Sequence, residues 1–591
     1  MDARQLWDTA GSIATRAVRT GMPIVGWLPR YDRRLLVPDS TGALAVWALL
    51  VPQSLAYASL AGVPPQAGLY AALAALLLYA IFGSCRGLNV GPSSAIAALS
   101  AATIAPLAGG DMGTFVALSA AAALLTGGVL VIAGLARLGF VAEFFAKPVL
   151  SGFVTGLALT IMSSQAPKIF GVQIEDGNFF QDVWRLVSAL DGTSLATLAV
   201  GAGTIAVIVV LSRFLPKLPS GLIAVVLALV VSSALDLEGR GVSVVGDIPR
   251  GLPAFGFPDV GLGAIIDLLP GVAGIALLAF AESIAGARAL ATRQGYEVDP
   301  NQELIGLGAA NAGAGLSQGF PVDASLSRSA VAERAGVKTQ MSGLVTAGLI
   351  VVTLFALAPL FHDLPDAALA GLILTAVAGL VDLRGLRRLL RLDWRDFGLA
   401  LLSLTGVLLF GILEGLLVAV TASLVALVWR AYRPASAVVG RVPGDGEADE
   451  TYQFRNVETH PTAETFPGLV IFRFDNELFF ANANGFRAEI RHLVQGADPP
   501  VREVLVDAAA ISHADTTATD MLHELIGELR HHGVALAIGR AKAPLREILE
   551  RSGVTEELGR ENLHDSVRSG VADYLRRHPE ARPVPAGRKV E

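Results

Sequence analysis

The chain has 591 residues, of which 53% are hydrophobic and 16% charged, with a net charge of −7 and a mean hydropathy of +0.57. Soluble globular domains carry about 25% charged residues, so this composition excludes an ordinary soluble protein and indicates a chain that lies largely in a membrane. The single cysteine, Cys85, excludes an intrachain disulfide framework, and the charge gives no indication of a nucleic-acid partner.

Residues 1–38 hold charged side chains throughout and no uninterrupted apolar core. A secretory signal peptide needs such a core, so we expect no cleaved leader in this segment. We predict instead an amphipathic cytoplasmic segment that lies on the inner membrane surface.

Fourteen apolar stretches within residues 39–432 are predicted to cross the membrane. A spanning helix needs roughly 20 apolar residues, and fewer when it is a half-helix buried in protein. The predicted spans are 41–58, 67–83, 93–107, 114–136, 146–165, 193–213, 219–235, 265–284, 302–317, 325–334, 340–360, 366–381, 396–411 and 414–430.

The charges of the connecting loops predict the orientation. Arginine and lysine concentrate in alternate loops, most densely in the loop 384–395, whereas the intervening loops are acidic. Basic loops stay in the cytoplasm, so we expect both termini on the cytoplasmic side of a bacterial inner membrane. Fourteen spans divide into seven plus seven, and an odd number in each half gives an inverted repeat.

Two of these spans, the third and the tenth, follow an extended segment of small and polar residues. The segments are Leu88–Pro92 and Gln318–Asp323, with helices expected from Ser93 and from about Ser325. Paired interruptions of this kind mark the binding site of many transporters, because bare backbone at membrane depth must line a cavity or lie in protein. The two helix N-termini would point toward one another, which favours an anion. An ordinary loop at Gly91-Pro92 is the alternative.

Several motifs along the chain resemble those of the SulP sulfate permease family, also called solute carrier family 26. They are VPQSLAYASLAGVPPQAGLY (51–70), GPS (91–93), AESI (281–284), GYEVDPNQEL (295–304), GFP (319–321) and SLSRS (325–329). The resemblance covers essentially the whole chain. It implies a core domain and a gate domain, a substrate between spans three and ten, a homodimer and a C-terminal cytoplasmic STAS domain.

Gln53 and Tyr57 lie four residues apart in the first span, and therefore on one face of a helix. The resemblance implies that both line the substrate cavity, where an amide and a phenol suit an oxyanion. Hydrogen bonds to a neighbouring helix are the alternative role for both side chains.

Arg328 is the predicted binding cation, because its planar fork matches an oxyanion and it lies in the first turn of span ten. The hydroxyl groups of Ser93, Ser94 and Ser327 are predicted to bind the substrate beside it, together with free helix N–H groups. Extension of Arg328 to the cytoplasmic surface is the alternative.

Glu282 is an ionisable group inside span eight, which marks a functional site by default. The resemblance implies that it carries the coupling proton, with sodium less favoured as the coupling ion. An ion pair of Glu282 with Arg328 is a second interpretation, compatible with the first. Asp323 departs from the small hydroxyl residue of many relatives, and we expect it to cap span ten, to take a second proton or to help hold a cation.

The composition after the last span predicts a linker at 433–451, a STAS domain at 452–580 and a tail at 581–591. Strands at 469–474, 503–507 and 534–539 alternate with helices near 482–495, 516–532, 543–552 and 564–577, which is an α/β pattern. In the bacterial relatives from which the STAS fold takes its name, an Asp-Ser-Ser motif at the start of a helix is phosphorylated. Thr516 and Thr517 stand at the matching place, and we favour helix capping over phosphorylation for them.

These features together predict a secondary active transporter that imports sulfate, or a similar oxyanion, with protons. Bicarbonate or a C4-dicarboxylate, carried by symport or exchange, stays open as the cargo. An anion-sensing signalling protein and an uncoupled anion channel are the alternatives from other classes. No enzyme activity, metal site or organic cofactor is expected, and the cytoplasmic partner of the STAS domain stays unidentified.

Overall fold

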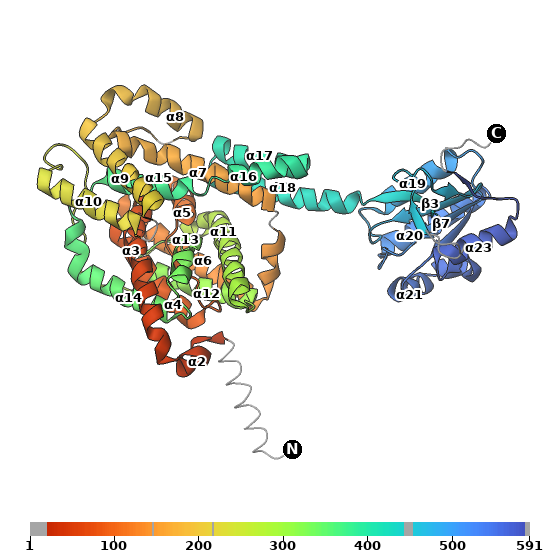
Figure 1. The fold of residues 1–591 in the computed structure, drawn as a ribbon, viewed down its shortest axis with the longest axis horizontal. Coiled ribbons are helices and arrows are strands. Elements are labelled where there is room, and N and C mark those ends of the chain that lie inside the picture. The colour runs from red at the N-terminus through yellow and green to blue at the C-terminus, as the bar shows by residue number, and fades with distance from the viewer. Residues whose placement is uncertain (1–20, 145–146, 176, 216–217, 443–452, 586–591) are drawn as a thin grey trace, which may run out of the picture. The chain divides into compact units, whose positions relative to one another are not determined.

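The computed structural model describes residues 21–144, 147–175, 177–215, 218–442 and 453–585 (Figure 1). The chain forms two compact units that divide between Ser423 and Leu424. Residues 1–20 of the predicted N-terminal segment lie outside the described residues. The rest of that segment holds the short helix α2 (Ile24–Trp27) and two 3-10 turns, Leu28–Arg30 and Arg33–Leu35.

Each of the fourteen predicted spans coincides with a helix; the first thirteen lie in the first unit, and the last crosses the division between the units. The first seven are α3 (Leu36–Leu60), α4 (Pro65–Phe82), α5 (Ser94–Ala108), α6 (Met112–Leu135), α7 (Lys147–Phe170), α9 (Leu195–Phe214) and α10 (Ser220–Leu235). The second seven are α11 (Leu262–Gln294), α12 (Pro300–Leu316), α13 (Leu326–Arg334), α14 (Met341–Val352), α15 (Asp366–Ala378), α17 (Trp394–Phe410) and α18 (Ile412–Tyr432). Helix α14 continues through a π turn (Thr353–Leu357) and a 3-10 turn (Ala358–Phe361).

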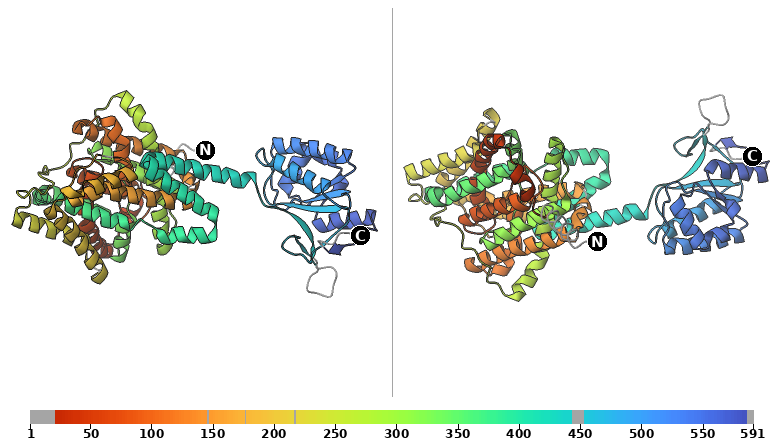
Figure 2. Two further views of the ribbon diagram at one scale, coloured as in Figure 1. Left: turned by 90° about the horizontal axis from the view of Figure 1, so that it is seen from above. Right: turned by 90° about the horizontal axis from the view of Figure 1, so that it is seen from below.

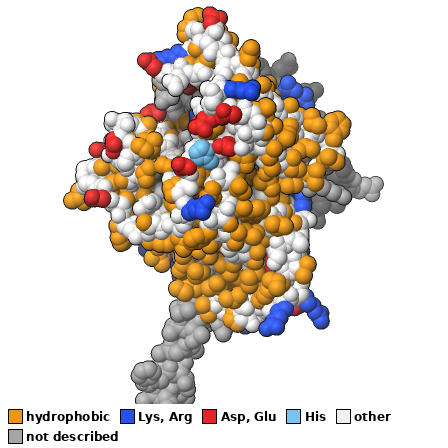
Figure 3. Space-filling view, turned by 90° about the vertical axis from the view of Figure 1, so that its left-hand side faces the viewer, with side chains coloured by type: hydrophobic (Ala, Val, Ile, Leu, Met, Phe, Trp, Pro, Cys, Tyr) orange, Lys and Arg blue, Asp and Glu red, His pale blue; other side chains and the backbone are white. Residues whose placement is uncertain are grey.

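The described residues contain nine helical segments that are long and apolar enough to cross a membrane, besides the shorter apolar helices α5 and α10. Their outward faces carry large apolar side chains, among them Ile132, Phe214, Val230 and Val425. A broad hydrophobic surface lies on the face drawn in Figure 3. Such a surface needs lipid around it, so the chain is an integral membrane protein.

Two amphipathic helices of this unit were not predicted. Helix α8 (Phe179–Ser188) exposes Phe180 and Trp184, and α16 (Leu383–Leu392) exposes Leu390 beside its four arginines. The latter occupies what the sequence predicts as a cytoplasmic loop. An apolar face with aromatic or basic residues on its rim is typical of helices that lie in the membrane interface.

The helices pack in two groups. Helix α12 packs against α4 and α6, α11 against α5 and α6, and α14 against α3 and α4. In the other group α7 contacts α9, α15 and α17, and α10 packs on α9. These two groups correspond to the predicted core and gate domains, so the expected division of the bundle is confirmed.

The two extended segments form a short antiparallel ladder inside the core group. Strand β1 (Val90–Gly91) pairs with β2 (Asp323–Ala324), with Val90 opposite Ala324 and Gly91 opposite Asp323. Equivalent segments of the two halves that run antiparallel are what an inverted repeat requires. The breaks are therefore real interruptions, and an ordinary loop at Gly91-Pro92 is excluded.

Glycines let α7 and α17 approach closely. A Cβ at Gly152 would overlap the carbonyl oxygen of Ala400, and one at Gly156 would lie 3.0 Å from that of Leu404. We therefore predict that Gly152→Ala destabilises the folded protein by roughly 1–3 kcal/mol, because the helices must separate. The measurement is thermal unfolding in detergent, with Gly128→Ala on α6 as the control, since a Cβ there meets nothing within 4 Å. Equal midpoints for the two variants would contradict this prediction.

The second unit is an α/β domain whose sheet has the order β10-β5-β3-β6-β7-β8-β9, with β4 also paired to β3. The strands are β3 (Ser436–Val442), β4 (Gln453–Asn456), β5 (Glu464–Thr465), β6 (Leu469–Phe474), β7 (Glu503–Asp507), β8 (Ala535–Gly539), β9 (Leu563–His564) and β10 (Val584–Pro585). The helices are α19 (Ala483–Gln495), α20 (Thr516–His531), α21 (Ala543–Arg551), α22 (Val554–Leu558) and α23 (Val567–Arg577). Helices cover both faces of the sheet (Figure 2).

Two predicted boundaries of this domain are wrong. Strand β3 lies within the predicted linker and pairs antiparallel with β6, and β10 lies within the predicted tail and pairs with β5. Strand β3 lies between β5 and β6, and β10 forms the edge of the sheet. Both pair with strands distant in sequence, which local composition does not reveal. Residues 443–452 and 586–591 lie outside the described residues.

The start of α20 is capped by Asp515, not by a threonine. The Asp515 carboxylate accepts hydrogen bonds from the N–H groups of Ala518 and Phe480, each at 2.8 Å. Thr516 and Thr517 follow as exposed residues of the first turn. The predicted capping role of the threonines is therefore wrong, while their phosphorylation stays a prediction.

Candidate functional site

The β1–β2 ladder is fastened to the helices around it by polar side chains. Asn311 of α12 bonds to the N–H and C=O of Val322, both at 2.9 Å, and Ser283 of α11 accepts from the Ala324 N–H at 3.0 Å. These contacts satisfy backbone groups that a helix would otherwise have satisfied. The extended backbone is thereby held in one conformation.

A second set of contacts joins the two breaks to each other. The Asn89 N–H donates to the hydroxyl of Ser329 at 2.9 Å, and its C=O accepts from the Ser325 N–H at 2.9 Å. Ser93 caps α5 and Ser325 caps α13, each accepting a backbone N–H of its own first turn at 3.4 Å. The N-termini of both half-helices therefore meet where the ladder ends, and their dipoles supply partial positive charge there.

Arg328 is fully buried at this junction, with 1% of its surface exposed. Nε donates to Asn89 Oδ1 at 2.7 Å, and Nη1 donates to the Pro92 carbonyl at 2.8 Å and to Gln53 Oε1 at 3.2 Å. Nη2 has no hydrogen-bond partner among the described residues and faces Gly91, where a Cβ would lie 3.5 Å away. Arg328 does not extend to the surface, so that alternative is wrong.

Tyr57 lies one turn beyond Gln53 on α3, with 5% of its surface exposed. Its phenol is next to the hydroxyl of Ser94, at the start of α5, and to the Arg328 guanidinium. The structure thus brings together four of the six predicted substrate residues, Gln53, Tyr57, Ser94 and Arg328. They come from α3, α5 and α13.

The other two predicted substrate residues are placed differently. The hydroxyl of Ser93 serves as the α5 cap and lies beside the carboxyl of Asp323. Ser327 is exposed, and its hydroxyl lies 3.1 Å from that of Ser325, away from the buried guanidinium of Arg328. Successive residues of a helix point in different directions, so Ser327 and Arg328 do not share a face.

The carboxyl of Asp323 lies next to that of Glu282, which reaches it from α11. Asp323 is completely buried, and neither of its oxygens makes a hydrogen bond of ordinary geometry with a described residue. Glu282 has Asp323 as its charged neighbour, and no described carboxylate forms an ion pair with Arg328. The expected Glu282–Arg328 pair is therefore wrong, and so is Asp323 as the cap of α13, since Ser325 holds that position.

Glu303 shows what a structural carboxylate looks like in the same bundle. It is completely buried on α12 and accepts four hydrogen bonds, from Tyr79 Oη (2.7 Å), Ser84 Oγ (2.6 Å) and the N–H groups of Ser84 and Cys85 (2.9 Å each). These bonds anchor the loop between α4 and β1. A carboxylate with four hydrogen bonds needs no ligand, whereas both oxygens of Asp323 are buried without such a bond to a described residue.

A separate cavity of about 1010 Å³ opens at the ends of α4, α11 and α13. Its walls carry Arg30, Arg86, Arg293 and Lys338, and Arg293 is paired with Glu333 at 2.9 Å. None of the predicted substrate residues lines it. It therefore adds nothing to the site at the junction of the half-helices.

Sequence reasoning missed Asn89, Ser283, Asn311 and Ser329 as parts of the site. Each is a small polar residue within or next to a predicted break or span. Asn89 lies inside the predicted break, two residues before Gly91-Pro92, which was a usable signal for a residue that positions Arg328. Ser283 and Ser329 lie inside the AESI and SLSRS motifs, whereas Asn311 lies in helix α12 without any local mark of its role.

Two family models match the chain. The model described as the sulfate permease family matches residues 36–403, and the STAS domain model matches residues 460–570. A probable sulfate transporter of Mycobacterium tuberculosis is 37% identical over 562 residues, covering 94% of this chain and 99% of the relative. The chloroplastic sulfate transporter 4.1 of Arabidopsis thaliana is 33% identical over 574 residues, covering 93% of this chain and 82% of the relative.

Solved structures share the fold. The structure of SLC26A9 superposes with a TM-score of 0.86 at 23% identity, over 97% of this chain and 95% of that one. The transmembrane domain of the cyanobacterial bicarbonate transporter BicA gives 0.58 at 23% identity, over 66% of this chain and 98% of that one. The expected fold of fourteen helices with a C-terminal STAS domain is thereby confirmed.

Proposed function

This chain belongs to the sulfate permease family, and on that premise we propose that it is a secondary active transporter of a small oxyanion, sulfate first among the candidates. The observation that carries the proposal is the buried guanidinium of Arg328 between two helix N-termini. Its Nη2 keeps its donors free while the rest of the group is fixed by Asn89, Pro92 and Gln53. A cation held in this way is preorganised for a charge-assisted hydrogen bond from Nη2 to an oxyanion.

The neighbouring groups complete an oxyanion site in this proposal. Tyr57 and Ser94 supply hydroxyl donors, and the first turns of α5 and α13 supply free N–H groups. Movement of the core group against the gate group would then carry the site from one membrane face to the other. The hydrogen-bonded ladder would move with the core as one body.

The pair of Glu282 and Asp323 is proposed as the proton-coupling element. Two carboxylates in contact, away from water, repel each other and the incoming anion, so at least one must hold a proton when sulfate is bound. Protons would bind to this pair together with the anion on one side of the membrane and be released together with it on the other. This supports proton symport over sodium symport.

The choice of anion is tested by competition. In proteoliposomes, unlabelled sulfate should suppress uptake of labelled sulfate at lower concentration than bicarbonate or fumarate does. If bicarbonate or fumarate competes more strongly than sulfate, that anion is the substrate of the proposed site instead of sulfate.

We predict that Asp323→Asn lowers the number of protons carried with each sulfate. The substitution keeps the size of the side chain and removes one of the two proton acceptors, while Glu282 remains. The measurement is the pH gradient that just balances a fixed sulfate gradient in proteoliposomes, compared between wild type and variant. An unchanged ratio of protons to sulfate would remove Asp323 from the coupling mechanism.

The remaining assignments follow from the family and the charge distribution. We propose that the protein lies in the inner membrane of a bacterium as a homodimer, with both termini in the cytoplasm. The basic helix α16 then lies on the cytoplasmic surface, as the positive-inside rule requires. The STAS domain would meet its own partner in the cytoplasm.

A further inference from the structure

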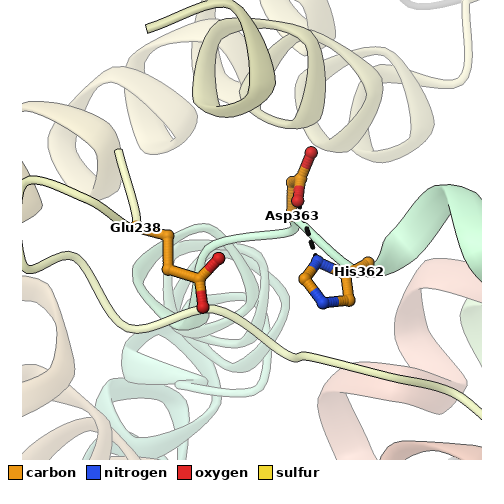
Figure 4. A group of neighbouring side chains, drawn as sticks. All are labelled: Glu238, His362 and Asp363. Carbon is orange, nitrogen blue, oxygen red and sulfur yellow. Dashed lines mark hydrogen bonds and ion pairs between the residues drawn. The ribbon is translucent and has the colours of Figure 1, made fainter. Parts of the chain in front are cut away.

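A group of possible metal ligands lies far from the substrate residues, where two connecting loops meet. Glu238 belongs to the loop that follows α10, and His362 and Asp363 belong to the loop that precedes α15 (Figure 4). His362 is the one histidine of this chain before His460. Acidic side chains gather around a histidine on the face drawn in Figure 3.

The geometry of the group is compact. One ligand atom from each of Glu238, His362 and Asp363 lies within 4.8 Å of the others. His362 Nδ1 is 2.8 Å from Asp363 Oδ1, and Nε2 is 3.6 Å from Asp247 Oδ1. Ligands of a tetrahedral ion with bonds of about 2.1 Å lie roughly 3.4 Å apart. Side-chain rotation at these solvent-accessible positions is enough to reach that spacing.

The backbone holds the two loops side by side. The N–H of Val245 donates to Leu364 at 2.9 Å, that of Gly246 to His362 at 3.0 Å, and that of Asp366 to Ser243 at 3.0 Å. The ligands on one loop are therefore presented to those on the other before any ion binds. Such preorganisation lowers the cost of closing a site.

The donor set selects a class of ion. An imidazole nitrogen combined with carboxylate oxygens suits Zn²⁺ and related transition metals, whereas Ca²⁺ and Mg²⁺ take oxygen ligands. Glu238, Asp247 and Asp363 place three carboxylates around one imidazole. That charge attracts a divalent cation.

We propose that Glu238, His362 and Asp363, with Asp247 within reach, form a binding site for a divalent transition-metal ion such as Zn²⁺. The site joins the two loops that cross between the packing groups, since one leads from α10 to α11 and the other from α14 to α15. A bound ion therefore links the loop between α10 and α11 to the loop between α14 and α15. It therefore slows the movement of the core group against the gate group.

The test is calorimetric titration of the purified full-length protein with Zn²⁺. We expect His362→Asn to bind one Zn²⁺ fewer per chain, and Glu238→Gln to bind at that site at least tenfold more weakly. The other eight histidines supply a background that the variants leave unchanged. Asp259→Asn, which removes a carboxylate from the same loop outside the group, should match wild type.

Equal stoichiometry and affinity in wild type and His362→Asn would overturn the site. Displacement of bound Zn²⁺ by an equal concentration of Ca²⁺ would overturn the choice of a transition metal.

Anion exchange in proteoliposomes tests the cross-link separately. Saturating Zn²⁺ should slow wild type several-fold and leave His362→Asn unaffected, and unchanged exchange in wild type would overturn the cross-link. The titration does not depend on which anion is carried, so its failure and that of the transport proposal are distinguishable.

Discussion

Arg328→Ala is expected to lower sulfate uptake about 10- to 100-fold in proteoliposomes. The substitution removes the buried cation at the junction of the half-helices together with its free Nη2. A hydrogen bond to a charged group is worth about 1.5–3 kcal/mol, and Nη2 is the nitrogen of Arg328 without a partner among the described residues. Since each 1.4 kcal/mol corresponds to a factor of ten, the expected loss is about 10- to 100-fold.

The design has to separate binding from folding, because Arg328 also joins Asn89, Pro92 and Gln53. Arg328→Lys keeps the charge and loses the fork, so it should fold and transport with a raised KM. Arg334→Ala removes an exposed arginine from the other end of α13 and should behave as wild type. Wild-type uptake by a folded Arg328→Ala protein would show that the anion binds elsewhere.

Glu282→Gln is expected to abolish accumulation of sulfate driven by a proton gradient, a loss of at least tenfold, while exchange of sulfate for sulfate continues. Glutamine keeps the size and polarity of the side chain but cannot cycle between protonated and ionised forms. The binding groups of α3, α5 and α13 stay in place, so the anion can still enter and leave.

The comparison is gradient-driven uptake against counterflow in the same vesicles, each at several pH values. Glu414→Gln supplies the control, because it removes an exposed carboxylate of α18 far from Asp323 in sequence. A Glu282→Gln protein with the full pH dependence of wild type would exclude Glu282 as the proton carrier.

Much of the fold can be predicted from the sequence because a helix that crosses a membrane must be a long run of apolar residues. Apolar length predicted all fourteen helices, and the segments before Ser93 and Ser325 predicted the paired breaks. The amphipathic helix α16 was missed because its arginines disqualify it as a span, although they suit the interface. Strand β3 was missed because its partner β6 lies beyond a stretch of loop composition.

The site was predictable in its chemistry but not in its contacts. Residue type alone identified Arg328, Glu282 and Asp323, because an ionisable group inside a membrane is energetically costly and marks a functional site. Their partners depend on how α11 and α13 are rotated, which a sequence without periodic marks does not specify. Asp323 therefore proved to be the neighbour of Glu282, and Ser327 proved to be exposed.

The most direct test of the account is uptake of labelled sulfate into proteoliposomes that contain the wild-type protein, with an inward proton gradient and without one. We expect sulfate to accumulate above its external concentration only when the gradient is present, and proton entry to accompany it. Sulfate uptake that only equilibrates, whether or not the gradient is present, would contradict proton-coupled transport.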